Sequence, residues 1–373
     1  MREDVPSAKS VKPATVKRMI DRYLADSGRI AAQLIDMAGE LKKENGVCLI
    51  FLHKSVDGDC VGSACGLCVA LRRIGVEAYV AMPEELPENM GFLGVDHLLF
   101  DVTADTEVTK AFRENGTVFD RKFTRAVSVD ISESERMGAC GEYFDKCPNK
   151  IIIDHHASVS TRADNMWIDP DASSACELVY YVICSVAKLL GKPVNALIDK
   201  LCAGCLIAGM VTDTGRFTYK NTRPETLVSA GELMSLGGDI SSVCYNLFDL
   251  KKMSKFRLSA AARSKAEFLC GGKFAISVVP FSMFREYGAD ADGVDDVVSA
   301  LRDVDGVEIA IVLRELENGV IRGNVRSTDT FNSAAFAGLY GGGGHLRAAG
   351  FSVRDMKIDA LADEVKERVE KLL

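Results

Sequence analysis

The sequence predicts an α/β protein in which a doubly wound, mostly parallel sheet is followed by a smaller α/β domain. With 373 residues and 47% hydrophobic composition, the chain can bury a large core and is long enough for two domains. Its β-rich apolar runs alternate with segments of helical periodicity, which is typical of parallel strands with helices on both faces. Four such runs are expected to form strands, at 47–53, 76–82, 125–130 and 150–154.

The order of the expected elements divides the chain into four parts. These are an N-terminal helical extension, a large α/β domain, a charged linker helix and a smaller α/β domain, at 1–45, 46–248, 249–269 and 270–373. Helices of the large domain are expected at 62–71, 173–190, 195–211 and 224–236. Strands of the smaller domain are expected at 273–279, 307–313 and 319–326.

Charge and hydropathy exclude several classes of protein. The net charge of −8 argues against binding to long double-stranded nucleic acid, because such binding needs a basic face. No apolar run reaches the roughly 18 residues of a membrane helix, and the N-terminus lacks the apolar core of a signal peptide. A cytoplasmic protein with no membrane partner is therefore expected.

Two Cys-x-x-Cys pairs, Cys65/Cys68 and Cys202/Cys205, raise the alternative of a four-thiolate zinc or iron–sulfur site. Both pairs lie in apolar stretches that are expected to be buried helices. Cysteines in such positions usually pack as small hydrophobic residues. We expect these four cysteines to belong to the core.

Polar side chains collect where the expected strands end. The stretch IIIDHHASVS (151–160) is one example, because three isoleucines lead directly into an aspartate and two of the chain's five histidines. Ligands of doubly wound proteins bind at the carboxyl ends of the strands. The candidate residues at these ends and in adjoining segments are His53, Asp57, Asp59, Asp130, Asp154, His155, His156 and Asp213.

Taken singly, such residues have structural explanations, since an aspartate after a strand often caps a helix or turn. A lone histidine such as His97 is usually a structural hydrogen-bonding residue. Together, however, five carboxylates in one crevice would repel one another unless cations neutralised them. Aspartate and histidine ligands favour Mn²⁺ or Mg²⁺, and their number suits two ions. Two ions about 3.5–4 Å apart can support in-line phosphoryl displacement.

In their order, these motifs resemble those of the DHH phosphoesterase superfamily. HxxxDxD at 53–59, an aspartate closing a strand at 130, DHH at 154–156 and DTGRF at 213–217 match its four motifs. The later GGGGH at 341–345 resembles the DHHA1 domain of the same superfamily. The resemblance covers about residues 46–355 and implies an N-terminal DHH domain and a smaller DHHA1 domain. One departure is Val56, where the family commonly has proline; this changes the rigidity of the turn and removes no ligand.

The resemblance also implies a set of metal ligands. One ion would be held by His53, Asp57 and Asp130, and the other by Asp59, Asp130, His155 and Asp213. Asp130 would thus bridge the two ions. Mn²⁺ is the expected ion, with Mg²⁺ or Co²⁺ as substitutes.

Three residues are expected to be catalytic on the same grounds. Asp130 would bridge the ions, Asp154 would orient a ligand histidine through a hydrogen bond, and His156 would face the scissile phosphate.

The glycine run of the smaller domain is a candidate substrate site. Consecutive glycines let the backbone approach a ligand closely and present N–H groups to an anion, and an arginine can clamp a phosphate. The alternative for such a run is a tight turn or a flexible linker. The expected substrate-binding residues are Arg326, Ser327, Gly342, Gly343, Gly344 and His345.

Within the superfamily the chain most resembles the NrnA-like group. We expect no OB-fold of the RecJ type, no membrane or sensor segment, and no pyrophosphatase C-terminal domain. The resemblance implies hydrolysis of very short RNA, of pApA-type dinucleotides and of pAp, with short RNA or small nucleotides as partners. An exopolyphosphatase-like activity and a non-catalytic nucleotide-binding regulator remain as alternatives. A homodimer is common among similar proteins and is compatible with the sequence.

Overall fold

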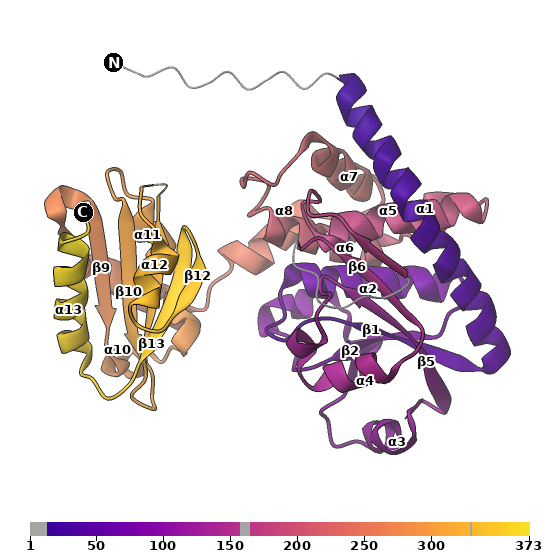
Figure 1. The fold of residues 1–373 in the computed structure, drawn as a ribbon, viewed down its shortest axis with the longest axis horizontal. Helices are drawn as coiled ribbons and strands as arrows, with labels where there is room; N and C mark the ends of the chain where they lie inside the picture. The colour runs from indigo at the N-terminus through magenta and orange to yellow at the C-terminus, as the bar shows by residue number, and fades with distance from the viewer. Residues whose placement is uncertain (1–12, 157–164, 329) are drawn as a thin grey trace. The chain divides into compact units, whose positions relative to one another are not determined.

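The computed structural model describes residues 13–156, 165–328 and 330–373, and it divides the chain into two compact units with the boundary after Asp249 (Figure 1). The first 12 residues of the N-terminal extension and the 157–160 part of IIIDHHASVS lie outside the described residues. Each unit has its own sheet and its own hydrophobic core.

A mostly parallel sheet forms the centre of the first unit, as the alternating pattern predicts. Strands β3, β2, β1, β5, β6 and β7 run parallel in that spatial order, and the short β4 pairs antiparallel with β5. The bounds are β1 Gly46–Phe51, β2 Ala78–Met82, β3 Leu99–Asp101, β4 Thr117–Val118, β5 Arg121–Val129, β6 Lys150–Asp154 and β7 Asn165–Ile168.

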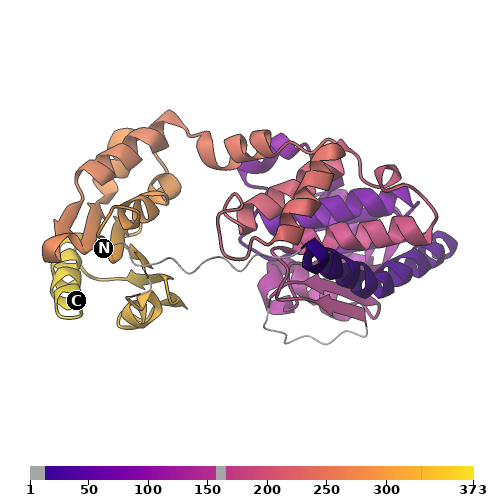
Figure 2. The same cartoon turned by 90° about the horizontal axis from the view of Figure 1, so that it is seen from above.

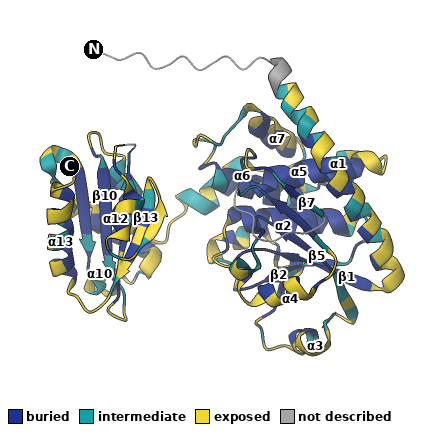
Figure 3. Ribbon diagram, in the orientation of Figure 1, coloured by how far each residue is buried: buried dark blue, intermediate teal, exposed yellow. Residues whose placement is uncertain are grey.

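Helices cover both faces of this sheet (Figures 1 and 3). Their bounds are α1 Pro13–Glu44, α2 Gly58–Arg73, α3 Glu107–Asn115, α4 Gly141–Lys146, α5 Ala175–Leu189, α6 Lys200–Asp213, α7 Pro224–Ser235 and α8 Ile240–Cys244. Short 3-10 helices lie at η1 Glu88–Leu93, η2 Asp96–Leu98, η3 Ser134–Cys140 and η4 Val194–Ala196, and a π-helix at η5 Tyr245–Asp249.

Strand β1 illustrates why its sequence is continuously apolar. Cys48 and Ile50 belong to the core formed with α1, α2, α5 and α6. Leu49 and Phe51 point to the opposite face and pack in the core that includes Phe144 of α4. Because alternate side chains enter two different cores, an apolar residue is favoured at every position of this strand.

Helix α1 packs against the rest of the first unit along much of its length, beside α5 (Figure 2). Tyr23 is fully buried and stacks on Tyr181 of α5 at 4.8 Å between ring centroids. Arg22 forms an ion pair with Asp169 at 2.8 Å, and Arg29 donates to the carbonyl of Met166 on β7. The N-terminal helix therefore braces the strand that follows the DHH motif.

The second unit contains a smaller mixed sheet in the order β12-β13-β11-β10-β9-β8, in which β9 and β10 pair in parallel and the other pairs are antiparallel. Helices α12 and α13 pack on one face, and α9, α10 and α11 pack on the other. The strands are β8 Glu267–Leu269, β9 Phe274–Val279, β10 Ile309–Glu315, β11 Ile321–Ser327, β12 Gly343–His345 and β13 Ala348–Val353. The helices are α9 Met253–Ser264, α10 Phe281–Tyr287, α11 Val297–Arg302, α12 Ser333–Gly338 and α13 Ile358–Glu370, with 3-10 turns η6 Cys270–Gly272 and η7 Ala291–Val294.

The two Cys-x-x-Cys pairs belong to the core, as expected. Cys65 and Cys68 on α2 and Cys202 and Cys205 on α6 are fully buried. Burial raises the pKa of each thiol, which disfavours the thiolate that a metal site would need. None of the four belongs to a candidate metal group among the described residues.

Within the part of the chain that the structure describes, no helix combines the length and the apolar character needed to cross a membrane.

Candidate metal centre

The candidate ligands converge at the carboxyl ends of the central strands of the first unit. His53 follows β1, Asp130 follows β5, and the DHH sequence ends β6. These three strands are neighbours in the sheet. The end of α6 adds Asp213. Segments far apart in the sequence are thus brought together at the carboxyl ends of the strands, as the strand pattern predicts.

The turn between β1 and α2 positions two aspartates differently. Asp57 is the N-cap of α2, and its Oδ1 accepts hydrogen bonds from the backbone N–H groups of Asp59 and Cys60, each at 3.0 Å. Its Oδ2 lies 3.7 Å from Nε2 of His53. Asp57 therefore combines the capping role typical of such a residue with a place in the cluster.

Asp59 is fully buried on α2 and receives two backbone hydrogen bonds from the start of α5. The N–H of Ala175 donates to Oδ2 at 2.6 Å, and the N–H of Cys176 donates to Oδ1 at 2.9 Å. The free N–H groups and the dipole at a helix N-terminus stabilise a carboxylate. This contact fixes the Asp59 side chain beneath His155, whose Nε2 is 3.7 Å from Oδ2.

Asp130 lies at the middle of the cluster and touches a histidine with each oxygen. Its Oδ2 is 3.2 Å from Nε2 of His53, and its Oδ1 is 3.2 Å from Nε2 of His155. The residue is 2% exposed and has a φ of 60°, a left-handed conformation that is uncommon outside glycine. Such strain is maintained where the surrounding structure requires it, often at functional sites.

The isoleucines of IIIDHHASVS and the DHH residues after them have different environments. Ile151, Ile152 and Ile153 are buried strand residues, and the strand carries the DHH side chains to the edge of the sheet. Asp154 is buried and accepts hydrogen bonds at Oδ1 from the backbone N–H of His156 at 3.1 Å and from its Nδ1 at 2.8 Å. Asp154 therefore does not hydrogen-bond a ligand histidine, as we expected, but His156, the residue expected to face the phosphate.

Asp213, the last residue of α6, completes the cluster from the other side. Its Oδ2 lies 3.3 Å from Nε2 of His155. His155 therefore has oxygens of Asp59, Asp130 and Asp213 around one ring nitrogen.

The electrostatics are those of a crowded anionic site. Burial and the charge of Asp130 raise the pKa of Asp59 to about 7, and burial with the charges of Asp59 and Asp130 raises the pKa of Asp213 to about 8. Burial acts against ionisation of Asp130 as well, but its two histidine neighbours hold its pKa at about 2.

The histidines respond in the opposite sense. Burial lowers the pKa of His53, yet its hydrogen bond to Asp130 and the nearby carboxylates outweigh burial and raise it to about 9. Burial also disfavours the charged form of His155, while Asp130, Asp59 and Asp213 raise its pKa to about 10. Protons on these groups therefore compensate the carboxylate charges, which is the task of metal ions in such a cluster.

The residues present fit divalent cations. Three overlapping groups each have ligand atoms within 4.8 Å of one another: His53, Asp57, Cys60 and Asp130; Asp130, His155 and His156; and Asp59, His155 and Asp213. Within this cluster, Oδ2 of the buried Asp154 accepts no hydrogen bond. A buried oxygen without a donor is costly unless a cation or water satisfies it.

Sequence reasoning missed three residues that support this cluster. Cys60 accepts a hydrogen bond from the N–H of Asp57, and burial holds the pKa of its thiol well above the usual value, so it braces the turn as a thiol. Gly209 of α6 lies against Asp59, since a Cβ there would stand 2.6 Å from Oδ1 of Asp59. The only sequence feature that pointed to Gly209 was its position in a helix rich in small residues.

Asn221 is the third missed residue. Its Nδ2 donates to the carbonyl of Ser173 at 3.0 Å and to the carbonyl of Asp213 at 3.1 Å. Ser173 precedes the α5 N-terminus that holds Asp59. A single amide therefore links the backbone segments that carry and support two candidate ligands.

In the second unit, Arg326 and His345 occupy the same row of the sheet. Arg326 on β11 pairs with Ala348 on β13, which pairs with His345 on β12. Paired residues of neighbouring strands point to the same face, so both side chains lie on one face with the small Ala348 between them. Ser327 points inward, where its hydroxyl donates to the carbonyl of Phe331 and contacts Ser333.

The glycine run forms the edge strand of a hairpin. A Cβ at Gly342 would lie 2.2 Å from the carbonyl oxygen of Gly350, and one at Gly344 would lie 2.5 Å from that of Ala348. Gly344 also has a φ of 145°. Gly343, between them, has open space around it. Close approach of the β13 backbone thus accounts for Gly342 and Gly344, and β12 is exposed along its length.

Comparison with known proteins agrees with this architecture. The model of the DHH family, N-terminal domain, matches residues 47–210, and that of the DHHA1 domain matches residues 271–371. A Thermus thermophilus protein, named bifunctional oligoribonuclease and PAP phosphatase NrnA, is 31% identical over 90% of this chain and 93% of its own length. The chain belongs to the DHH/DHHA1 phosphoesterases, in their NrnA-like group.

A further relative and one solved structure agree with this assignment and with the fold. A Bacillus subtilis protein of the same name is 26% identical over 82% of this chain and 89% of its own length. The crystal structure of an exopolyphosphatase-related protein from Bacteroides fragilis covers 98% of this chain and 99% of its own, with a TM-score of 0.77 at 22% identity, and shows the same fold. As a DHH/DHHA1 phosphoesterase, the protein is a hydrolase that acts on phosphoester bonds.

Proposed function

We propose that this protein is a manganese-dependent phosphoesterase that degrades very short RNA and pApA-type dinucleotides to mononucleotides and converts pAp to AMP. The observation that supports it most is the position of Asp130, whose two oxygens face two different histidines and thus two groups of candidate ligands. A carboxylate in that position can bridge two ions. The names of the Thermus and Bacillus relatives support the choice of substrate.

In this proposal one ion is held by His53, Asp57 and Asp130, and the other by Asp59, Asp130, His155 and Asp213. When bound, two such ions activate a water nucleophile and neutralise the charge that develops on the phosphoryl group. Mn²⁺ suits this mixture of imidazole and carboxylate ligands, and Mg²⁺ or Co²⁺ would be substitutes.

His156 and Asp154 act as a pair on the phosphate. The hydrogen bond from Nδ1 of His156 to Oδ1 of Asp154 fixes the ring and raises the pKa of this histidine, so the charged form is favoured. The His156 side chain is 38% exposed, unlike the more buried His155. We assign His156 the role of donating a hydrogen bond or proton to the phosphate through Nε2.

Arg326 and His345 are proposed to bind the end of the substrate, together with the backbone of Gly342, Gly343 and Gly344. An arginine can hold a phosphate in bidentate fashion, and the exposed β12 edge offers backbone N–H groups. Ser327 supports this site from inside, since its buried hydroxyl holds the segment that follows β11.

Two alternatives make different predictions. An exopolyphosphatase-like enzyme would use the same ions without recognising a base. A non-catalytic nucleotide-binding regulator would be favoured by loss of a candidate ligand, and every expected ligand is present here.

A homodimer and a cytoplasmic location complete the proposal. All twelve cysteines lie within the described residues and all are free thiols, as is usual in a reducing compartment.

The test is turnover by the purified protein with Mn²⁺ on pApA, a five-nucleotide RNA, pAp, pyrophosphate and short polyphosphate in parallel. Mononucleotide released from pApA and the five-nucleotide RNA would support the proposal, and the rate on pAp would show whether the enzyme is bifunctional. Turnover of polyphosphate alone would favour the first alternative. No turnover of any substrate would sink the enzymatic proposal.

A further inference from the structure

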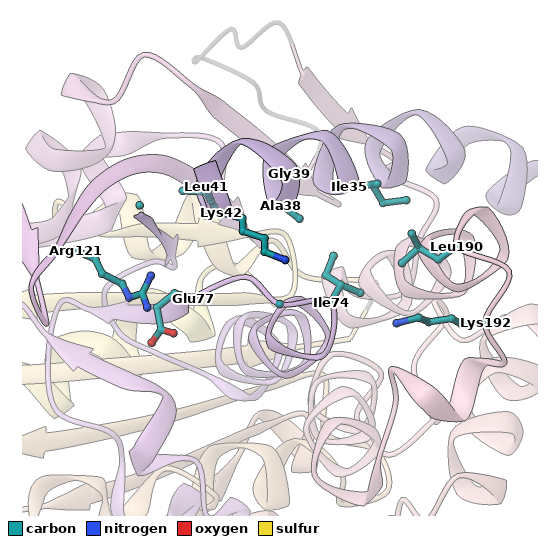
Figure 4. Close-up of a pocket in the computed structure, with 12 residues that line it drawn as sticks. Ile35, Ala38, Gly39, Leu41, Lys42, Ile74, Glu77, Arg121, Leu190 and Lys192 are labelled. Atoms are coloured by element: carbon teal, nitrogen blue, oxygen red, sulfur yellow. The ribbon is translucent and has the colours of Figure 1, made fainter. Parts of the chain in front are cut away.

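A cavity lies at the amino ends of the central strands of the first unit's sheet, opposite the candidate metal centre. It is bordered by the last turns of α1, the start of β1 at Gly46, the connection between α2 and β2, the start of β5 at Arg121 and the segment after α5. Its volume is about 560 Å³. Figure 4 shows the residues that line it. Pockets that hold small organic ligands have volumes of this order.

The cavity wall combines apolar and cationic side chains. Ile35 of α1, Ile74 after α2 and Leu190 after α5 supply apolar surface. Figure 4 shows Lys42 reaching down from α1 and Lys192 extending from the segment after α5 into the same space. The wall therefore suits a ligand with an apolar body and negatively charged groups.

The positive charges of these side chains are largely not neutralised by protein carboxylates. Among the described residues, neither Lys42 nor Lys192 takes part in an ion pair, and Arg121 donates to the amide oxygen of Asn45 rather than to a carboxylate. The one acidic residue in the wall is Glu77, which accepts a hydrogen bond from Tyr79. In a chain with a net charge of −8, three cations facing one acid form a local site for an anion.

Gly39 adds an independent observation. It lies inside α1, where glycine costs helix stability relative to alanine. A Cβ at this position would meet nothing within 4 Å, so packing does not require glycine there. Gly39 is exposed and lines the cavity, where it has no side chain to occupy the space.

We propose that this cavity binds an organic phosphate of nucleotide size. Its phosphate groups would meet Lys42 and Lys192, and its base or other apolar body would pack against Ile35 and Ile74. The site does not depend on the proposed catalytic function. It is joined to the metal centre by β1, which leads to His53, and by α2, which begins at the Asp57 cap and ends beside Ile74.

The test is calorimetric titration of the full chain with ATP, AMP and pyrophosphate in EDTA, which removes divalent ions from the metal centre. Gly39→Leu fills the cavity with a better helix former, and Lys42→Glu reverses one cation. The matched controls are Gly28→Leu, another α1 glycine with open space around it that lies outside the cavity, and Lys43→Glu, the neighbouring exposed lysine.

We expect saturable ATP binding whose Kd rises about tenfold or more in Gly39→Leu and in Lys42→Glu, and is unchanged in both controls. Mn²⁺-dependent turnover by Gly39→Leu would show that the variant is folded. Absence of saturable binding, or an equal Kd in Gly39→Leu and the wild type, would overturn the site. Pyrophosphate binding as tightly as ATP would overturn the role given to the apolar wall.

Discussion

Replacing Asn221 with alanine tests whether the candidate ligands depend on their supporting backbone. The change removes two hydrogen bonds, from Nδ2 to the carbonyls of Ser173 and Asp213. Each such bond contributes about 0.5–1.5 kcal/mol, so the free energy of unfolding should fall by about 1–3 kcal/mol. Asp213 and the α5 N-terminus that holds Asp59 would both lose their link. Loss of such support typically weakens metal binding or activity by about 10–100-fold.

The assay compares urea unfolding of the metal-free protein with the Mn²⁺ concentration that gives half-maximal turnover of pApA. Asn246→Ala is the matched control, because Asn246 donates to the carbonyl of Ser242 in the same unit and contacts no candidate ligand. It should cost about 0.5–1.5 kcal/mol without changing the Mn²⁺ requirement. If Asn221→Ala needs no more Mn²⁺ than the wild type, the positioning role of Asn221 is refuted.

Three further predictions concern the same site. Gly209→Ala should destabilise the protein by about 1–3 kcal/mol in urea unfolding and impair turnover, because the new Cβ would stand 2.2 Å from the Cys176 sulfur. The control Gly204→Ala places its Cβ in open space and should be neutral or stabilising. The Mn²⁺ affinity should rise at least about tenfold per pH unit between pH 6 and 8, with proton release in calorimetry. The raised pKa values of Asp213 and His155 keep both side chains protonated at neutral pH, and metal ligands must be deprotonated. An affinity that does not change with pH would contradict this. Arg326→Ala should raise KM or lower kcat for pApA with bound Mn²⁺ unchanged, and loss of metal instead would refute its assignment to substrate.

The strands were predictable because they are buried on both faces. A sequence such as VCLIFL can satisfy two cores only as a central parallel strand, and the structure has β1 there. The short β3, β4 and β7 gave no such signal, since Thr117–Val118 and Asn165–Ile168 are too short for periodicity to reveal. Tertiary pairing with neighbouring strands defines them.

The clustering of the site was predictable for a similar reason. Parallel strands deliver their carboxyl ends to one edge, so aspartates and histidines after β1, β5 and β6 had to meet. Asn221 could not be found this way, because it contacts backbone carbonyls, which every residue type presents. Likewise, the partner of Asp154 depends on side-chain orientation: we expected a ligand histidine, and the structure has His156.

The most direct test of the account is the number of Mn²⁺ ions bound per chain, measured by elemental analysis after equilibration. We predict two ions in the wild type, and loss of both metal binding and turnover in Asp130→Ala, because each proposed ion loses a ligand. Asp101→Ala is the matched control, since Asp101 also ends a strand but accepts hydrogen bonds from Thr103 in a turn; it should keep both ions. A wild type that binds fewer than two ions, or an Asp130→Ala variant that keeps two ions and full turnover, would contradict the bridged metal centre.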